Sequence, residues 1–471
     1  MGWVLVSSLI IFLYFLLHFP SYNCLLCNPH DKYALLQLKN SFFVNSSFHF
    51  LLEYDPCFSH SSKTKSWKNI TDCCGWDGIT CDTKSGHVIG LHLYCSDLRG
   101  LIPQCLATFP SLWALDLQDN NLHGSIPDNF SKGNSFETLK LNGNQLKGPL
   151  PRSLAHCTKF EVLDLENNNI EDTFPYWLET LPNLQVLSLR SNKFHGVITS
   201  FGTKLPFPSL KIFDISDNYF TGPLPISYIH NFQGMNVNDN QTGLKYLGKN
   251  SLYNDSIVIV MKGLYMELAR ILTICTSIDL SNNMFEGEIS TVIGELHSLK
   301  GLNLSHNRIT GTIPLSLGNL SNLEWLDLSW NQLKGEIPMA LTNLNFLAVL
   351  NLSQNQFKGM IPKGGQFNTF ENDSYVGNPM LCGIPLSKSC KENEEKSPYS
   401  TLDKEESGFG WKSVVVGYAC GMIFGIILGC NVFFIGKPQL LARLVERVLN
   451  VRLIRPTSRK PTNCWKRIRL T

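Results

Sequence analysis

The sequence lacks the motifs on which most enzymes depend. It contains no HExxH metal-binding motif and no nucleophile elbow, and its 12 histidines are scattered without the spacing of metal ligands. The segment GLKYLGKN (243–250) comes within one residue of a phosphate-binding loop, but Asn250 stands where a hydroxyl would hold Mg²⁺. The final 35 residues, 437–471, contain neither the HRD nor the DFG motif of a protein kinase. We therefore expect no enzyme activity, no cofactor and no metal ion.

A strong charge of one sign is also missing, because the net charge of the whole chain is only +2. The charge is nevertheless unevenly distributed. Residues 437–471 hold ten Lys or Arg and one acidic residue, so this tail carries about +9 and everything before it about −7. A basic stretch beside a membrane serves topology and attraction to anionic lipid. We therefore expect no nucleic-acid partner.

Two long apolar runs predict an exported protein with one membrane span. Residues 3–19 are typical of a signal peptide, although no Lys or Arg precedes the run, and we place cleavage near Asn23. Residues 413–436 form an uncharged run of 24 residues, enough to cross a hydrocarbon core of about 30 Å. Because basic segments stay on the cytosolic side, the tail predicts a single-pass type I plasma-membrane protein with an extracellular N-terminal part.

Between these runs, a phrase of the form LxxLxLxxNxLxGxIP recurs with a period of 24 residues. Such a repeat cannot bury its apolar face alone and must stack on its neighbours. The predicted fold class is therefore α/β, a right-handed leucine-rich-repeat solenoid with a parallel concave β-sheet. A gap of 65 residues between the sixth and seventh copies predicts an insertion. The ten central residues are Leu91, Leu115, Leu139, Leu163, Leu187, Phe213, Ile278, Leu302, Leu326 and Leu350.

The polar and turn residues of the phrase have structural explanations. Gly and Pro of the GxIP ending suit a turn followed by a second short extended segment. The Asn of the phrase has the donors and the acceptor to satisfy backbone groups where the chain turns inward. Function is therefore expected at the outward positions of the strands. The predicted structural Asn column is Asn120, Asn144, Asn168, Asn192, Asn218, Asn283, Asn307, Asn331 and Asn355.

One outward column, just after the second leucine of each strand, varies before the insertion and is uniformly Ser after it. The variable half contains Glu166 and Arg190. It is either an ordinary solvated face or, together with Lys140, a polar recognition patch. Near the other end, His306 and Trp330 occupy the outward position just before the Asn. An exposed Trp there indicates a protein contact or stacking between neighbouring repeats.

Cysteines and glycosylation sequons both indicate an oxidising, extracellular environment. Twelve of the 15 cysteines precede the predicted span, and two clusters flank the repeats, as expected of disulfide-bonded caps. Cys382 and Cys390 are the favoured local pair, whereas the connectivity of Cys57, Cys73, Cys74 and Cys81 stays open. The nine Asn-x-Ser/Thr sequons are Asn45, Asn69, Asn129, Asn240, Asn254, Asn303, Asn319, Asn351 and Asn372.

Nearly the whole chain resembles the plant leucine-rich-repeat receptor-like proteins, a kinase-lacking group that includes fungal-resistance receptors of tomato. The resemblance rests on HDKYALLQLKNSFF (30–43) with DCCGWDGITCD (72–82), on NDSIVIVMKGLYMELARILTICTSIDLSNNMFEGEIS (254–290), and on GGQFNTFENDSYVGNPMLCGIPLSKSC (364–390). It implies a cell-surface receptor that senses an extracellular peptide, protein or carbohydrate, in defence or development. It also implies signalling through adaptor and co-receptor leucine-rich-repeat receptor kinases. Six repeats before the insertion are few for this family.

The resemblance assigns roles to two further sets of residues. Lys262 matches a recurring Lys-Gly pair of the family's insertion, the island, where it either contacts a ligand or shapes the return of the chain. Gly417, Gly421, Gly425 and Gly429 form a smooth stripe on the predicted span, to which the resemblance assigns a partner kinase. The predicted segments are a signal peptide (1–23), an N-terminal cap (24–87), repeats 1 to 6 (88–225), the island (226–276), repeats 7 to 10 (277–363), a C-terminal cap (364–390), an acidic juxtamembrane segment (391–412), the span (413–436) and a basic cytoplasmic tail (437–471).

Two other functions compete with that of a ligand-sensing receptor. The chain can be a non-sensing scaffold or decoy co-receptor, which keeps the partner-binding part without a ligand. It also resembles secreted inhibitors of cell-wall-degrading enzymes in having about ten plant-type repeats, although the predicted span and the island argue against that class.

Overall fold

A computed structural model of the chain describes residues 27–44, 57, 62–200, 202–236, 246–247, 255–261 and 264–390. None of the helices in these ranges is long and apolar enough to cross a membrane. The predicted signal peptide, the predicted span with its glycine stripe, and the basic tail lie outside the described residues.

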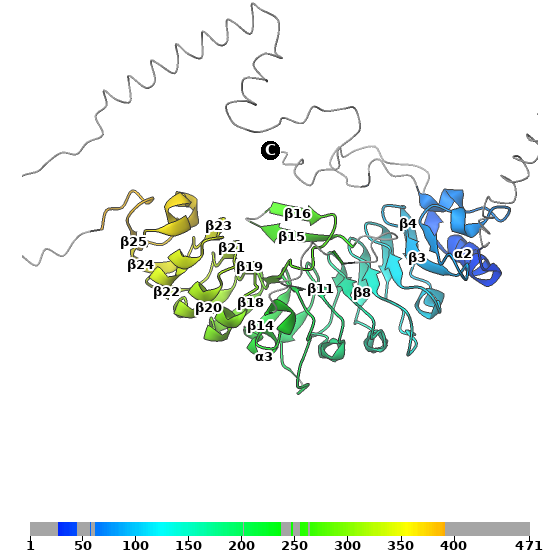
Figure 1. Cartoon of the computed structure of the whole chain (residues 1–471), viewed down its shortest axis with the longest axis horizontal. Helices are drawn as coiled ribbons and strands as arrows, with labels where there is room; N and C mark the ends of the chain where they lie inside the picture. Colours follow the sequence, from blue (N-terminus) through cyan, green and yellow to red (C-terminus); the bar gives the residue numbers. More distant parts are fainter. Residues whose placement is uncertain are drawn as a thin grey trace, which may run out of the picture. The chain divides into compact units, whose positions relative to one another are not determined.

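The central element is a sheet of eleven strands that lines the inner side of an arc (Figure 1). Each of the ten predicted central residues lies in its own strand, and these ten strands run parallel in register. β13 pairs directly with β17, so the insertion leaves the sheet uninterrupted. The strands are β2 (Ile79–Cys81), which is antiparallel, β3 (Val88–His92), β5 (Ala114–Asp116), β7 (Thr138–Lys140), β9 (Val162–Asp164), β11 (Val186–Ser188), β13 (Ile212–Asp214), β17 (Ser277–Asp279), β19 (Gly301–Asn303), β21 (Trp325–Asp327) and β23 (Val349–Asn351).

The apolar core lies behind this sheet because the side chains of a strand alternate between its two faces. Leu163 and Leu165 of the fourth repeat, for example, are completely buried, and the same pair recurs in the other repeats. Short 3-10 helices close the outer side of most repeats: η3 (Gln104–Thr108), η4 (Arg152–His156), η5 (Tyr176–Thr180), η7 (Thr291–Glu295), η8 (Leu315–Asn319), η9 (Met339–Asn343) and η10 (Gly365–Thr369). After the sixth repeat come a one-turn α-helix, α3 (Ile226–Ile229), and the 3-10 helix η6 (Gln233–Met235), and the C-terminal cap contains η11 (Asn372–Ser374).

The GxIP segments form further short strands beside the main sheet, as the Gly and Pro positions predict. They assemble into three small sheets rather than one continuous sheet. The first contains β1 (Phe43–Val44), β4 (Leu98–Leu101), β6 (Asn121–Gly124), β8 (Gln145–Gly148) and β10 (Asn169–Ile170); the second contains β12 (His195–Val197), β14 (Tyr219–Pro223), β18 (Met284–Glu288) and β20 (Arg308–Thr310); the third contains β22 (Lys334–Gly335), β24 (Gln356–Met360) and β25 (Met380–Cys382).

The Asn column is buried and hydrogen-bonded in the predicted way. In Asn331, the Nδ2 amide donates to the carbonyl oxygens of Leu304, Leu328 and Ser329 at 2.9–3.2 Å, and Oδ1 accepts from the backbone N–H of Ile309 at 3.0 Å. One side chain thus satisfies backbone groups of two successive repeats. The same pattern recurs along the solenoid and is completed in the C-terminal cap by Asn378.

The residue before each Asn adopts a left-handed backbone conformation. Asp119, Asn167, Asp217 and Asn282 have φ between 49° and 53°, a region that Asp and Asn tolerate better than bulky residues do. His306 and Trp330 stand in the same column with φ of 52°. These two aromatic residues are therefore held in a backbone conformation that the fold normally gives to small polar side chains.

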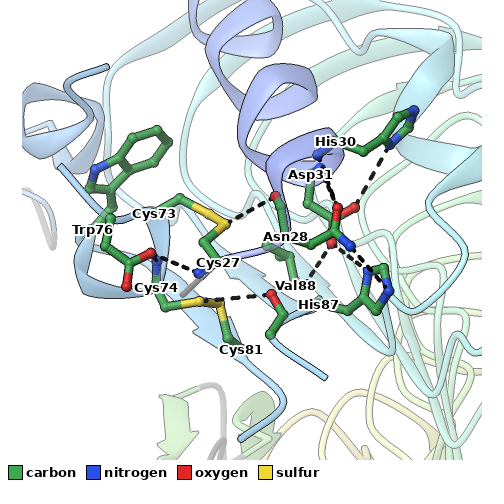
Figure 2. The surroundings of a disulfide bond; sticks show 12 residues. Cys27, Asn28, His30, Asp31, Cys73, Cys74, Trp76, Cys81, His87 and Val88 are labelled. Atoms are coloured by element: carbon green, nitrogen blue, oxygen red, sulfur yellow. Dashed lines mark hydrogen bonds and ion pairs between the residues drawn. A yellow bond between two sulfur atoms is a disulfide. The ribbon is translucent and has the colours of Figure 1, made fainter. Parts of the chain in front are cut away.

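Disulfide bonds hold both ends of the solenoid. In the N-terminal cap, Cys27 bonds to Cys73 and Cys74 to Cys81, around the helix α2 (Pro29–Ser41) and the 3-10 helix η2 (Cys73–Gly75) (Figure 2). A second 3-10 helix of this cap is η1 (Lys63–Ser66). Asp31 of α2 is buried and its Oδ2 accepts from the backbone N–H of Val88, which ties the helix to the first repeat. The other bonds within the described residues are Cys57–Cys95 and the predicted Cys382–Cys390.

Candidate functional site

The insertion forms an antiparallel hairpin, β15 (Ile257–Met261) and β16 (Leu264–Leu268), that lies on the inner side of the arc (Figure 1). We call the inner side of the eleven-stranded sheet the concave face. The backbone N–H of Leu247 donates to the carbonyl of Ile271, and that of Ile271 to the carbonyl of Asp255, so the segments flanking the hairpin are joined to each other.

Polar contacts fix this insertion to the concave face. The Thr138 hydroxyl donates to Oδ1 of Asp255 at 3.0 Å, and the Lys140 amine donates to Oγ of Ser256 at 2.7 Å. Further along the sheet, the amine of Lys211 donates to the carbonyl of Thr273 at 2.7 Å. The insertion is therefore bonded to the sheet at two places, about three strands apart.

An apolar cluster, separate from the leucine core, fills the space between the hairpin and the sheet. Its members on the sheet are concave-face residues at the position just before the central leucine, where exposed polar residues would otherwise be expected. Gly301 contributes to it indirectly: a Cβ atom built there would lie 1.9 Å from the Trp325 ring, so only glycine lets this ring lie over strand β19. The buried members are Val162, Val186, Ile212, Leu247, Ile257, Ile259, Ile271 and Trp325.

The predicted recognition patch lies beneath or beside this cover rather than in solvent. Lys140 is 1% exposed and Arg190 6% exposed, and the Glu166 side chain is 12% exposed. The expectation that these side chains face solvent is wrong: Lys140 lies under the insertion, which has no repeat pattern, and Glu166 and Arg190 are buried beside each other. Arg190 Nε lies 3.7 Å from Glu166 Oε1, and its Nη1 lies 3.9 Å from Asp214 Oδ2, so the predicted charges do lie together.

Acidic groups outnumber cations on the covered part of the concave face. Burial, followed by the repulsion of Asp164 and Asp214, raises the pKa of Glu166 above its ordinary value, against the opposing effect of Arg190. Burial likewise raises the pKa of Asp164, and in Asp279 burial and the nearby Asp214 act in the same direction. Burying this part of the concave face therefore costs more free energy when these carboxyl groups are ionised.

The Ser residues of the terminal repeats are engaged with their own strands. Ser281 Oγ donates to Asp279 Oδ1 at 2.6 Å, and Ser305 Oγ donates to Asn303 Oδ1 at 2.8 Å. Asn303 in turn donates through Nδ2 to Asp279 Oδ2 at 3.0 Å. This uniform half of the column thus forms a hydrogen-bonded scaffold.

The candidate glycosylation sites differ in accessibility. Asn303 is buried and its amide is bonded to Asp279, whereas Asn351 is half-buried and donates to Asp327. The sequons at Asn69, Asn129, Asn319 and Asn372 are exposed. Asn45, Asn240 and Asn254 lie outside the described residues.

We predict that Asn303 carries no glycan in the folded protein. A sugar on Nδ2 would have to occupy a buried position and would replace one of the two hydrogens of the amide that donates to the buried Asp279 carboxylate, so chains modified there are expected not to fold. Glycopeptide mass spectrometry of the secretory-pathway product is expected to find Asn303 unmodified and Asn319 modified. Substantial occupancy at Asn303 would show that this part of the strand is open.

His306 and Trp330 form the exposed aromatic feature of the terminal repeats. Their rings stack with centroids 5.4 Å apart and an angle of 14° between planes, so the predicted stacking between neighbouring repeats is confirmed. The Trp330 side chain is nevertheless 54% exposed. Stacking and exposure thus occur together, and the outer part of the pair is free to contact another molecule.

Several residues of the site escaped sequence reasoning. Asp255 and Ser256 bind the concave face although no motif distinguishes them, and Trp325 joins the covering cluster because Gly301 is small. For Trp325, the available signal was its position beside the small Gly301 in the same column. Lys262 lies outside the described residues, as do Gly417, Gly421, Gly425 and Gly429.

Comparison with known proteins supports both the fold and the resemblance. A family model described as "Leucine rich repeat" matches residues 275–333, and a second such model matches residues 111–132 and 159–181. A model described as "Leucine rich repeat N-terminal domain" matches residues 28–82, which contain α2 and the Cys74–Cys81 bond and begin one residue after Cys27.

Two curated relatives come from Arabidopsis thaliana. Receptor like protein 27 is 51% identical over 258 residues, which are 54% of this chain and 32% of that protein. Receptor-like protein 7 is 53% identical over 251 residues, which are 50% of this chain and 26% of that protein. The chain thus spans a third or less of the length of these relatives, and the matched half confirms the resemblance.

Among solved structures, a plant ice-binding protein superimposes with a TM-score of 0.58 at 28% sequence identity. The superposition covers 77% of this chain and 98% of that protein. This likeness supports the solenoid architecture derived from the repeats.

Proposed function

We propose, from the confirmed resemblance to plant leucine-rich-repeat receptor-like proteins, that this chain is a receptor component at the plasma membrane. In this proposal the solenoid is extracellular and senses a peptide, protein or carbohydrate ligand. Residues 413–436 anchor the chain, with Gly417, Gly421, Gly425 and Gly429 facing a partner helix. Signalling in defence or development then passes through adaptor and co-receptor receptor kinases, since the tail carries no kinase motif.

The observation that carries this proposal is the stacked pair of His306 and Trp330. A bulky residue with φ near +52° costs about 1–2 kcal/mol relative to a residue that tolerates this conformation. Asn, Asp or Gly occupies most other positions of the column, so the fold does not require aromatic residues there. A large aromatic surface, half exposed and kept against a backbone cost, is typical of a protein-binding anchor. We infer that it contacts a co-receptor kinase.

Replacing Trp330 with Asn separates binding from folding. Asn tolerates the left-handed backbone, so relief of strain offsets the lost stacking on His306, and the free energy of unfolding is expected to change by no more than about 1 kcal/mol. Loss of an anchoring Trp is expected to weaken co-receptor association by about tenfold or more. The measurement is quantitative co-precipitation of the full-length chain with a panel of co-expressed leucine-rich-repeat receptor kinases.

The matched control is Gln354→Asn, which changes a half-buried residue of the same column and the same backbone conformation. It is expected to leave association unchanged. If Trp330→Asn is as well folded as the parent protein and recovers the same kinases in the same amounts, the pair is not a co-receptor contact.

The covered concave face favours a second candidate, a scaffold or decoy that pairs with receptor kinases without sensing a ligand. Lys140 is buried under the insertion, to which its amine is hydrogen-bonded, so a ligand cannot reach it while the insertion stays in place. Titrating the full-length protein in detergent with peptide and carbohydrate fractions, and then with receptor-kinase ectodomains, separates the two functions. Binding to the kinases alone would favour the scaffold.

A further inference from the structure

Among the described residues of the insertion, Asp255 is a buried carboxylate that is poorly accommodated on the concave face. It is 1% exposed, and its Oδ1 accepts from Thr138. Within the described residues, its Oδ2 has no hydrogen-bond partner. Lys140, the nearest cation of strand β7, gives its hydrogen bond to Ser256 instead. A buried carboxylate in this arrangement keeps its charge at a cost in free energy.

The other charges that face Asp255 do not offset this cost. Lys140 of β7 attracts the carboxylate, whereas Glu161, just before β9, and Asp116 of β5 repel it. Burial is the largest influence and raises the pKa of Asp255 from 3.8 to about 6. On the opposite strand of the hairpin, Glu267 of β16 adds to the repulsion around Asp119. Proton binding by Asp255 therefore favours the covered arrangement.

We propose that the described hairpin segment of the insertion, residues 255–261 and 264–272, is a proton-controlled cover of the concave face, which is held down through Asp255 in acidic surroundings and loosened at neutral pH. The role of the cover in ligand access rests on the proposed receptor function; the opening itself does not. Asp255 and Ser256 are bonded to Thr138 and Lys140, so opening would expose these two residues of the concave face to solvent. The apolar cluster around Val162, Val186 and Ile212 opposes opening equally at every pH, because none of its side chains titrates, so the pH dependence comes from Asp255.

The direction of the effect follows from proton linkage. The covered state binds the Asp255 proton more tightly than the open state does, since the pKa is about 6 when covered and 3.8 for an ordinary Asp. The contribution of this group to closure is therefore complete below about pH 4 and is lost as the pH rises through about 6. Acid keeps the cover closed, and neutral pH favours opening.

Hydrogen exchange measured by mass spectrometry on the full-length chain in detergent tests this directly. After correction for intrinsic exchange rates, amide protection in residues 255–272 is expected to be about tenfold or more higher at pH 5 than at pH 7.5. Strands β19 to β23 serve as an internal reference and are expected to show no such difference.

Asp255→Asn removes the ionisable group and adds a donor at the unpartnered position, so protection is expected to stay high at both pH values. Glu286→Gln changes an exposed carboxylate of β18, away from the cover, and is expected to keep the parent's pH dependence. Lys140→Met is a second probe: it removes the attractive charge, so opening should begin at a lower pH. Equal protection of the parent at pH 5 and 7.5, or an unchanged pH dependence in Asp255→Asn, would overturn the proposal.

Neither ligand nor kinase enters this experiment, so its outcome is independent of the proposed receptor function. If the cover opened equally at every pH, the interpretation of the Trp330→Asn experiment would not change. If the chain bound no co-receptor, the pH dependence of opening could still be measured.

Discussion

Replacement of Asn331 by Ala is expected to lower the free energy of unfolding of the terminal repeats by about 3–5 kcal/mol. The substitution removes three donated bonds, to Leu304, Leu328 and Ser329, and the acceptor for Ile309 N–H. All of these groups are buried in the turn, and an unsatisfied buried polar group costs about 1–3 kcal/mol. Partial relaxation and water entry keep the total below the sum. Urea denaturation, combined with hydrogen exchange at strands β19 to β23, measures the loss.

Two variants define the cause of that loss. Asn331→Asp keeps the shape and the acceptor but removes the donors, and it buries a charge, so it should be at least as destabilising. Gln332→Ala changes the exposed neighbouring side chain and should stay within about 0.5 kcal/mol of the parent protein. If Asn331→Ala matched Gln332→Ala, the Asn column would contribute packing rather than hydrogen bonds.

The parts of the fold that sequence reasoning predicted are those determined within one repeat and its neighbours. A leucine 24 residues after another must stack on it, which placed the ten central residues in successive strands. The Asn column and the short strands of the GxIP segments followed from local hydrogen-bonding needs and from the fixed φ of proline. The backbone conformation before each Asn was not anticipated, although the frequent Asp, Asn and Gly there are its signal.

The covered concave face depended on contacts between residues far apart in the sequence. Thr138 and Asp255 are separated by 117 positions, and Lys140 and Ser256 by 116. No periodicity relates the insertion to the strands that it covers, so Lys140 and Arg190 were expected at an exposed surface. The β-branched residues Val162, Val186 and Ile212 on an outward column were the available evidence for an apolar partner.

The disulfides show the same division between local and distant information. Cys382 and Cys390 are eight positions apart and were predicted as a pair, which is confirmed. Cys27 and Cys95 were missed as partners of Cys73 and Cys57, because they lie 46 and 38 positions away. Cys27 directly precedes Asn28, whose side chain accepts hydrogen bonds from the first N–H groups of α2. This N-cap residue therefore indicates that Cys27 lies beside the start of the helix.

Removal of the Cys27–Cys73 bond is the second change with a large expected effect. The bond closes a loop of 46 positions, whereas Cys74–Cys81 closes one of 7. Loop-closure entropy predicts a loss of about 4 kcal/mol for the longer loop and about 2 kcal/mol for the shorter one. The Cys27→Ala/Cys73→Ala and Cys74→Ala/Cys81→Ala double variants therefore form a matched pair, with the same chemistry in the same cap and different loop lengths.

The loss should appear first where the cap meets the solenoid. Asp31 binds the Val88 N–H only while α2 is held in place, and this helix covers the apolar end of the first repeat, where Leu91 is buried. Because each repeat contacts only its neighbours, opening of the cap is expected to propagate inward from β3 while β19 to β23 stay protected. Hydrogen exchange of β3 and β5 in the two double variants measures this gradient. Equal losses in both variants would mean that strain or packing around the sulfurs, rather than loop length, sets the stability of the cap.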